Sequence, residues 1–289
     1  MYQLQYLWHP KQILFNSLRG WSICCATGGQ LRALRGVNLK RDEGVSLSVF
    51  SNFLFNRNIY FTRLDNFSDP LEGLDMKTRF LLHLKNITKD SDDSDPLRQL
   101  VHSENTALLK EELEKWQKGI FASCWFLTED KHSESLAMWE LYSNQNGFVI
   151  KIPLELFNEL LDNSLNNLKD IPIVEANFGK IEYLDYHEQP DLNERSLIMP
   201  ALVKHYSYSH ENEIRYLLLW DAEKKHTTNF INLNFSDYLN KVKDSFEVIS
   251  HPNMDNTLFD LYFQKFKEIQ IELKKSKLLT KEIFSTLVK

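Results

Sequence analysis

The amino-acid sequence predicts an α+β fold with a mixed, mainly antiparallel sheet core and helical insertions. Short β-branched and aromatic runs are interspersed with amphipathic runs, the passages between expected strands are irregular, and no glycine-rich phosphate loop follows a strand. The last two observations argue against a doubly wound parallel sheet. Neither an internal repeat nor a long linker occurs, so we expect residues 1–289 to form a single α+β domain.

Periodicity and turn residues define the expected elements. Strands are expected at residues 58–62, 120–127, 147–152, 179–185, 212–220, 228–234 and 246–250. Helices are expected at residues 46–55, 78–87, 95–119, 133–143, 153–161 and from about 256 onward. Residues 1–45 are interpreted as an uncertain N-terminal extension, and residues 89–119 as a charged loop and helical insertion in which Asp95 caps the helix and Pro96 begins it.

Composition limits the class of protein. With 43% hydrophobic and 26% charged residues, the chain has the balance of a soluble globular protein. No apolar run approaches the roughly 20 residues that span a bilayer, and the first residues lack a signal-peptide block, so we expect a cytoplasmic protein without membrane contact. The net charge of −6 argues against a broad polyphosphate-binding face but leaves room for a local basic groove.

The first candidate cluster follows the strand expected at residues 58–62. It contains Arg63, Asp65, Asn66, Asp69 and Glu72 within the stretch RLDNFSDPLEG. Aspartate before proline and asparagine are typical of an ordinary turn. Several polar groups directly after an apolar strand are equally typical of a substrate-binding loop, so both interpretations stay open.

The second cluster is the stretch LAMWELYS. On a helix, Met138 and Tyr142 lie one turn apart on one face, next to Trp139. A methionine and aromatic residues at this spacing are usual in a packed core and also suit a cofactor contact.

The third cluster opens the stretch ENEIRYLLLW. In an extended chain Glu211, Glu213 and Arg215 share one face, because side chains alternate. One interpretation is a solvated strand edge, where Arg215 neutralises a glutamate at little energetic benefit. The apolar continuation instead predicts a strand that enters the core, where a pair of carboxylates is costly without a function.

Read in order, these segments resemble a widespread bacterial family, the domain of unknown function numbered twenty-nine seventy-one. That family shows a Phe-Asn-Asp-Pro-Phe-Glu loop, then a Met-Trp…Tyr…Gly segment and a Lys…Tyr-Glu-x-Glu-x-Arg segment. The matching part runs over residues 58–219, with Ser68 and Leu71 replacing the usual asparagine and phenylalanine. The family in turn is similar to ADP-ribosyltransferases, which carry a Glu-x-Glu pair at the start of a late strand.

This resemblance implies an ADP-ribosyltransferase-like fold and an enzyme that transfers ADP-ribose from NAD, its substrate, to RNA, DNA or protein. It also implies a toxin or phage-defence effector with an antitoxin protein as a partner. Glu213 would be the catalytic carboxylate beside the ribose, Glu211 would engage the acceptor and Tyr142 would stack on nicotinamide. The implied cofactor contacts, with no metal, are Arg63, Asn66, Asp69, Glu72, Met138, Trp139 and Arg215.

Two other function classes remain open. A metal-dependent nuclease would gather Mg²⁺ with carboxylates, here Asp69, Glu72, Glu211 and Glu213. A non-catalytic nucleotide-binding or sensor module would keep the same pocket as a ligand site. The three classes differ in label transfer from NAD, in chelator-sensitive cleavage and in ligand binding without turnover.

Overall fold

The computed structural model describes residues 22–26, 53, 56–67, 69, 71–74, 82, 85–86, 89, 114–128, 134–143, 145–166, 171–185, 198–224, 226–236 and 247–278. Most of the helices expected at residues 46–55, 78–87 and 95–119 lie outside these ranges. Residues 114–119 are helical, which agrees with the predicted end of the helix at residues 95–119.

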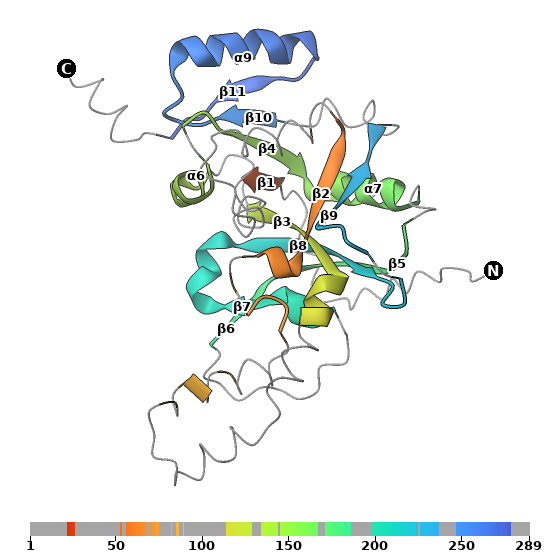
Figure 1. Ribbon diagram of the computed structural model, residues 1–289. Helices are drawn as coiled ribbons and strands as arrows, with labels where there is room; N and C mark the ends of the chain where they lie inside the picture. Colours follow the sequence, from red (N-terminus) through yellow and green to blue (C-terminus); the bar gives the residue numbers. More distant parts are fainter. Residues whose placement is uncertain are drawn as a thin grey trace.

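The fold is α+β, with a mixed, mainly antiparallel sheet (Figure 1). The main sheet contains β1 (Ser22–Ala26), β2 (Asn58–Arg63), β3 (Ile120–Thr128), β4 (Phe148–Pro153), β5 (Ile173–Lys180), β8 (Glu213–Trp220), β9 (Phe230–Asn234), β10 (Glu247–Ser250) and β11 (Leu273–Lys275). Its one parallel pair among the described strands is β10 with β11. A separate parallel pair joins β6 (Glu182–Leu184) to β7 (Val203–His205).

Strand β3 is where the sheet branches. Along one edge it pairs with β8 from Ile120 to Phe126. Along the other edge it pairs with β2 near Ala122 and with β1 from Phe126 to Thr128. The near-continuous apolar sequence of β3 fits this central position, because such a strand is buried on both faces.

The two faces of β3 contribute to different clusters. Phe121, Trp125 and Leu127 belong to the large apolar core, which also includes residues of α7 (Leu154–Asn166) and α9 (Asn256–Glu268). The alternate residues Ala122 and Cys124 pack on the opposite face, in a smaller cluster. This second face also bears the charged residues at the start of β8.

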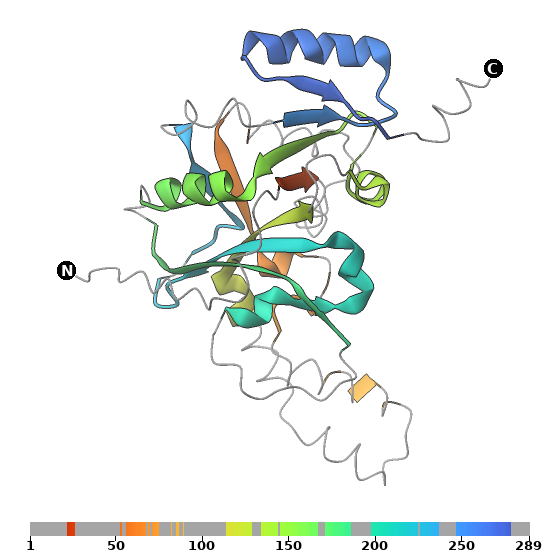
Figure 2. The same cartoon turned by 180° about the vertical axis from the view of Figure 1, so that it is seen from behind.

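The helices surround the sheet rather than forming a layer of their own. In Figures 1 and 2, α6 (Leu136–Tyr142) and α7 lie at opposite ends of β4, and α9 lies beside β10 and β11 at one end of the molecule. Ser135 caps α6 by accepting a hydrogen bond from the Met138 amide, which begins the helix where the sequence predicts one. Within the described ranges, every helix is too short or too polar to cross a bilayer.

One expected strand needs correction, and one described strand is additional to those expected. The strand expected at residues 179–185 is interrupted at Ile181, where the chain leaves β5 for β6; the Ile181 amide donates to the Glu213 carbonyl at 2.9 Å. The rest of β5 lacks the alternation that predicts a strand, because exposed and half-buried residues follow each other irregularly. Within residues 1–45, which were expected to be an extension, Ser22–Ala26 forms β1, between β4 and β3.

Candidate active site

Strand β8 begins at Glu213, after the 3-10 helix η4 (Tyr206–Glu211). Between them Asn212 adopts a left-handed conformation (φ 35°, ψ 55°), which asparagine tolerates better than most residues. Its side chain donates to the Leu127 carbonyl at 2.5 Å, and the Leu127 amide donates to the Asn212 carbonyl at 2.9 Å. The predicted extended face is therefore wrong at Glu211, because the chain turns at Asn212.

Glu211 nevertheless meets Glu213 and Arg215 in a buried charge cluster that also contains Glu72 and Lys204. Each of these five side chains belongs to a residue that is at most 5% exposed. They come from the loop at residues 71–74, from β7, from η4 and from β8, so several elements converge on the start of β8. We call this set of five residues the charge cluster.

Arg215 binds two carboxylates of the charge cluster. Its Nε and Nη2 donate to Glu213 Oε1 and Oε2 at 2.8 and 3.1 Å, and its Nη1 and Nη2 donate to Glu72 Oε2 and Oε1 at 2.8 and 3.2 Å. Nη1 also donates to the Ala201 carbonyl at 2.8 Å. This arrangement uses the planar fork of a guanidinium, which matches two-oxygen acceptors.

Lys204 binds three carboxylates. Its Nζ lies 2.5 Å from Glu211 Oε2, 3.3 Å from Glu213 Oε2 and 3.4 Å from Glu72 Oε1. Three carboxylates thus face two cations, which leaves the charge cluster with one formal negative charge in excess.

Tyrosines surround the carboxylate pair. The Tyr142 hydroxyl at the end of α6 donates to Glu211 Oε1. The Glu213 amide donates to the Tyr183 hydroxyl at 2.9 Å. These contacts tie α6 and β6 to the two glutamates.

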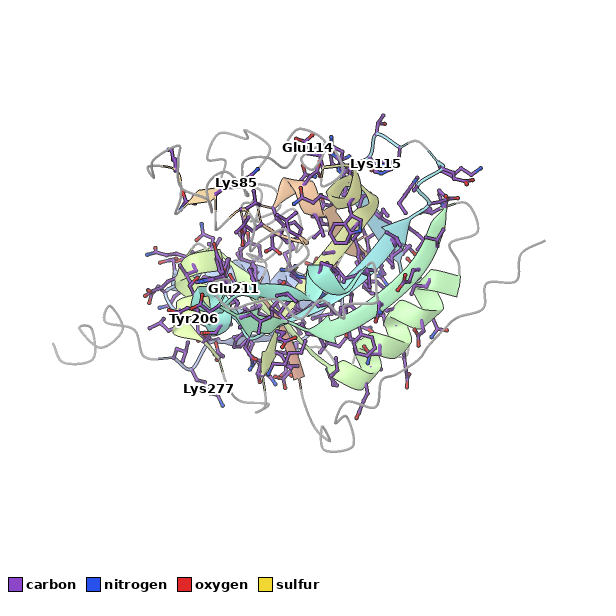
Figure 3. The ribbon with its side chains drawn as sticks, turned by 90° about the horizontal axis from the view of Figure 1, so that it is seen from below. Lys85, Glu114, Lys115, Tyr206, Glu211 and Lys277 are labelled. Carbon is purple, nitrogen blue, oxygen red and sulfur yellow. The ribbon has the colours of Figure 1, made fainter. Side chains whose placement is uncertain are left out.

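Helix η4 connects the charge cluster with the surface. Its first residue, Tyr206, is 56% exposed and its last, Glu211, is 5% exposed. Figure 3 shows both labels on the same flank of the molecule. Between them Tyr208 places its ring 4.7 Å from Lys204 Nζ, a cation–π contact that covers the ammonium.

Glu213 and Glu72 remain ionised despite their burial. Burial opposes ionisation of Glu213, but the Arg215 guanidinium and the Lys204 ammonium outweigh it and hold the pKa of that carboxyl well below its ordinary value. The same two cations outweigh burial at Glu72 and lower its pKa. In turn Glu213 and Glu72 outweigh the burial of Lys204 and raise the pKa of its ammonium.

Cys124 is a neutral neighbour of this ionised set. Burial and then the negative charge of Glu213 raise the pKa of its thiol well above the usual value. The thiol is therefore protonated at neutral pH, and it lies against the Glu213 carboxylate. It acts as a small, uncharged packing group beside the cluster.

Arg63 and Asn66 of the predicted substrate loop lie outside the charge cluster. Arg63 donates to Asp65 through Nε at 2.6 Å and Nη2 at 2.9 Å, and to the Thr228 carbonyl at 3.0 Å. Asn66 donates to the Asn229 carbonyl at 3.4 Å. Both side chains connect the end of β2 with the segment before β9.

Asp69 has the role of an ordinary turn residue. Its Oδ1 accepts from the Leu71 amide at 2.9 Å, and its carbonyl accepts from the Glu72 amide at 3.1 Å. Glu72, three residues later, does join the charge cluster. The turn interpretation and the site interpretation of this loop therefore each fit part of it.

Met138 and Trp139 pack in the interior. Met138 lies with Tyr142 against Phe126. Trp139 packs with Val149 and other buried residues, and its indole donates to Glu134 Oε2 at 3.1 Å. Of the three residues of α6 predicted to be in the site, Tyr142 alone makes a contact with the charge cluster among those described.

Lys204 is the member of the charge cluster that sequence reasoning did not identify as a site residue. The signal was present, because the family resemblance includes a lysine before the Glu-x-Glu pair. A buried lysine cannot be distinguished from an exposed one by residue type, since lysine is almost always exposed. Its backbone position is set by the pairing of β7 with β6, where it lies opposite Tyr183.

Metal binding has little geometric support. Within the described ranges, no group of three or more histidine, cysteine, aspartate or glutamate residues is arranged to hold a metal ion. The carboxylates of the charge cluster are already paired with Lys204 and Arg215.

Comparisons of the chain with protein-family models, with curated proteins and with solved structures gave no match. Any function proposed for the chain therefore rests on the chemistry of the charge cluster and on the sequence motifs.

Proposed function

We propose that the chain is an ADP-ribosyltransferase-like enzyme that transfers ADP-ribose from NAD to a macromolecular target. The observation that carries the proposal is the carboxylate pair Glu211 and Glu213, held together by Lys204 at the start of β8 in a cluster with excess negative charge. The family resemblance supports the same assignment. It also supports the wider proposal of a toxin or phage-defence effector that an antitoxin protein controls.

The charge cluster suits the chemistry of this transfer. In the reaction the bond between nicotinamide and C1′ of the ribose breaks, its electron pair leaves with neutral nicotinamide, and the ribose gains oxocarbenium character. An acceptor atom of the target then bonds to C1′ and loses its proton to a base. A preorganised negative charge stabilises the positive charge that develops on the sugar, and ionised Glu213 supplies it. Glu211 would receive the acceptor proton.

The contacts refine the remaining roles. Arg215 is 0% exposed and bound to two carboxylates, which supports a role in holding Glu213 and Glu72 rather than a pyrophosphate. Tyr142 donates to Glu211, which supports a role in orienting the acceptor base. Arg63 is the more accessible of the two arginines among the implied cofactor contacts, with a side chain that is 13% exposed, and is therefore the proposed contact for the pyrophosphate of NAD.

Labelled NAD tests this proposal. We expect the chain to transfer label to a protein, RNA or DNA pool, and Glu213→Gln to reduce the rate about 100-fold or more, because it removes the charge beside the sugar. Glu182→Gln is the matched control, since it makes the same change at an exposed position on β6 next to the site and should retain full activity. Intact NAD with unlabelled pools would reject the proposal.

A second candidate, a non-catalytic nucleotide-binding module, is favoured by one specific observation. Both carboxylate oxygens of Glu213 already accept hydrogen bonds from Arg215, and Lys204 lies close to Oε2. A carboxylate whose two oxygens are both occupied by hydrogen bonds from cations within the protein is typical of a structural ion network. This candidate predicts that NAD raises the melting temperature while remaining unconsumed, and any turnover of NAD removes it.

A further inference from the structure

Lys204 occupies a fixed position in the interior. It is the central residue of β7 and pairs with Tyr183 of β6. The residue is 3% exposed, so its ammonium group has left bulk water on folding. Leaving water is unfavourable for an ammonium unless anionic acceptors replace its hydration, and here they do.

The three carboxylates around Lys204 come from three different elements. Glu72 belongs to the loop after η2 (Leu64–Asn66), Glu211 to η4 and Glu213 to β8. An ammonium has three N–H donors, and each carboxylate has an oxygen within 3.4 Å of Nζ. Lys204 is therefore the cation that connects the two glutamates of the pair with each other.

Without this cation the pair would be unstable in its present form. Two carboxylates that share a buried site repel each other, and one of them then retains its proton. Arg215 binds Glu213 and Glu72 through four hydrogen bonds, so its charge compensates these two glutamates. The ammonium of Lys204 is the charge that Glu211 and Glu213 share.

We propose that Lys204 is a positioning residue of the transfer reaction, whose ammonium holds the Glu211 and Glu213 carboxylates side by side. This inference rests on the proposed function for its catalytic meaning. Its physical content, the pairing of two buried carboxylates by one lysine, is measurable without any turnover.

All groups that face the carboxylate pair enter its titration. The charged ones are Glu72, Lys204 and Arg215. The neutral titratable ones among the described residues are Cys124, Tyr142, Tyr183 and Tyr208. Burial and then the charge of Glu213 raise the pKa of Tyr183, and the pKa of Cys124 is raised likewise, so these two stay protonated across the acid and neutral range.

The first test is the pH profile of label transfer for Lys204→Met and Lys204→Arg. Loss of the ammonium should move the acid limb of the profile upward by about one pH unit or more, because proton uptake by the pair is no longer opposed. Lys204→Arg keeps the charge and should keep the position of the acid limb. Lys180→Met, at an exposed site at the end of β5, is the matched control. An equal fall in rate at every pH would overturn the inference.

The second test needs no activity. The pKa of Glu213 is lowered on folding, so this group stabilises the fold above its unfolded pKa of about 4.3 and loses that contribution as the pH falls through the folded value. In Lys204→Met the folded pKa moves toward the unfolded one, and the acid-induced fall of the unfolding free energy should become shallower. Carboxyl carbon resonances of isotope-labelled glutamate report the same shift directly.

These readouts separate the two proposals. A wild-type chain that transfers no label from NAD rejects the enzyme, while an unchanged carboxyl titration in Lys204→Met rejects the role of Lys204. If Lys204→Met does not fold, the double variant Glu72→Gln with Lys204→Met keeps the net formal charge of the charge cluster and still removes the ammonium between Glu211 and Glu213. It should show the same upward shift.

Discussion

Arg215 donates to Glu72 and Glu213 while it is shielded completely from solvent. Replacing it by methionine removes the charge and leaves three buried carboxylates, those of Glu72, Glu211 and Glu213, that Lys204 alone must compensate. Breaking a buried ion pair from one side costs about 3–5 kcal/mol, since the remaining charge cannot return to water. We therefore expect Arg215→Met to lower the unfolding free energy by about that amount in a urea titration at neutral pH.

Arg63 provides the matched control for this substitution. Its guanidinium also donates two hydrogen bonds to one carboxylate, that of Asp65. Both side chains are partly exposed, at 13% and 18%. Solvent reaches this pair in part and compensates some of the lost contacts, so Arg63→Met should lower the unfolding free energy clearly less than Arg215→Met does. Similar losses for the two variants would contradict the buried and closed character of the charge cluster.

For individual residues, the sequence predicts which side chains lie next to each other on a strand better than it predicts which distant side chains they bind. Glu213 and Arg215 share a face because they are two positions apart in a strand, and alternation predicts that. Glu72 is 143 residues from Arg215, so no local pattern connects them. Glu211 reaches the cluster through the turn at Asn212, a conformation that single-residue preferences permit but do not require.

Among the elements, the loop at residues 71–74 depends on Gly73. This residue has φ of +74°, and a Cβ there would lie 2.7 Å from Leu64 Cδ1 and 2.8 Å from Trp116 Cζ3. We expect Gly73→Ala to destabilise the fold by at least about 1 kcal/mol from the backbone conformation alone, with the steric overlap in addition. Because Glu72 is the adjacent residue, the carboxyl titration of the charge cluster should shift in the same variant.

Gly119 offers the contrasting substitution at the end of the helix before β3. A Cβ at this position meets nothing within 4 Å, and the residue has no positive φ. Gly119→Ala should therefore leave stability unchanged or raise it by about 0.4–1 kcal/mol, because it restricts the unfolded chain. Thermal unfolding of both variants measures the difference, and an equally harmful Gly119→Ala would show that the effect at Gly73 is not local.

Elements were predictable where their burial is regular. The positions of β3 and β8 were predicted correctly from the sequence. Both strands are buried along most of their length and consist largely of apolar residues. Most of strand β5 was not predicted, because its exposed and half-buried residues do not alternate with a period of two. Strand β1 is held by pairing with β4 and β3, and its stretch SICCA is too short to be recognised alone.

Across the whole molecule, the branched sheet separates two environments. One face bears the large apolar core, which includes Phe121 of β3 and Tyr216 of β8. The other face bears Cys124 and, opposite it in register, Arg215, next to the remaining charge cluster. The apolar face supplies the main driving force for folding. The charged groups, whose burial opposes folding, thus lie partly on strands whose positions are already set by packing of the apolar face.

This division predicts an order of stability that hydrogen exchange measures. Strand β3 is paired along both edges and is buried along almost its entire length, so its amides should exchange only through global unfolding. Among the described strands β5 pairs only with β8 and is largely exposed, so its amides should exchange faster through local opening. Low urea should accelerate exchange in β3 and leave β5 almost unaffected, since only global unfolding exposes much surface. Equal protection and equal urea dependence in the two strands would mean that the sheet opens as one cooperative unit, and that β5 is as firmly held as the strands that position the carboxylates.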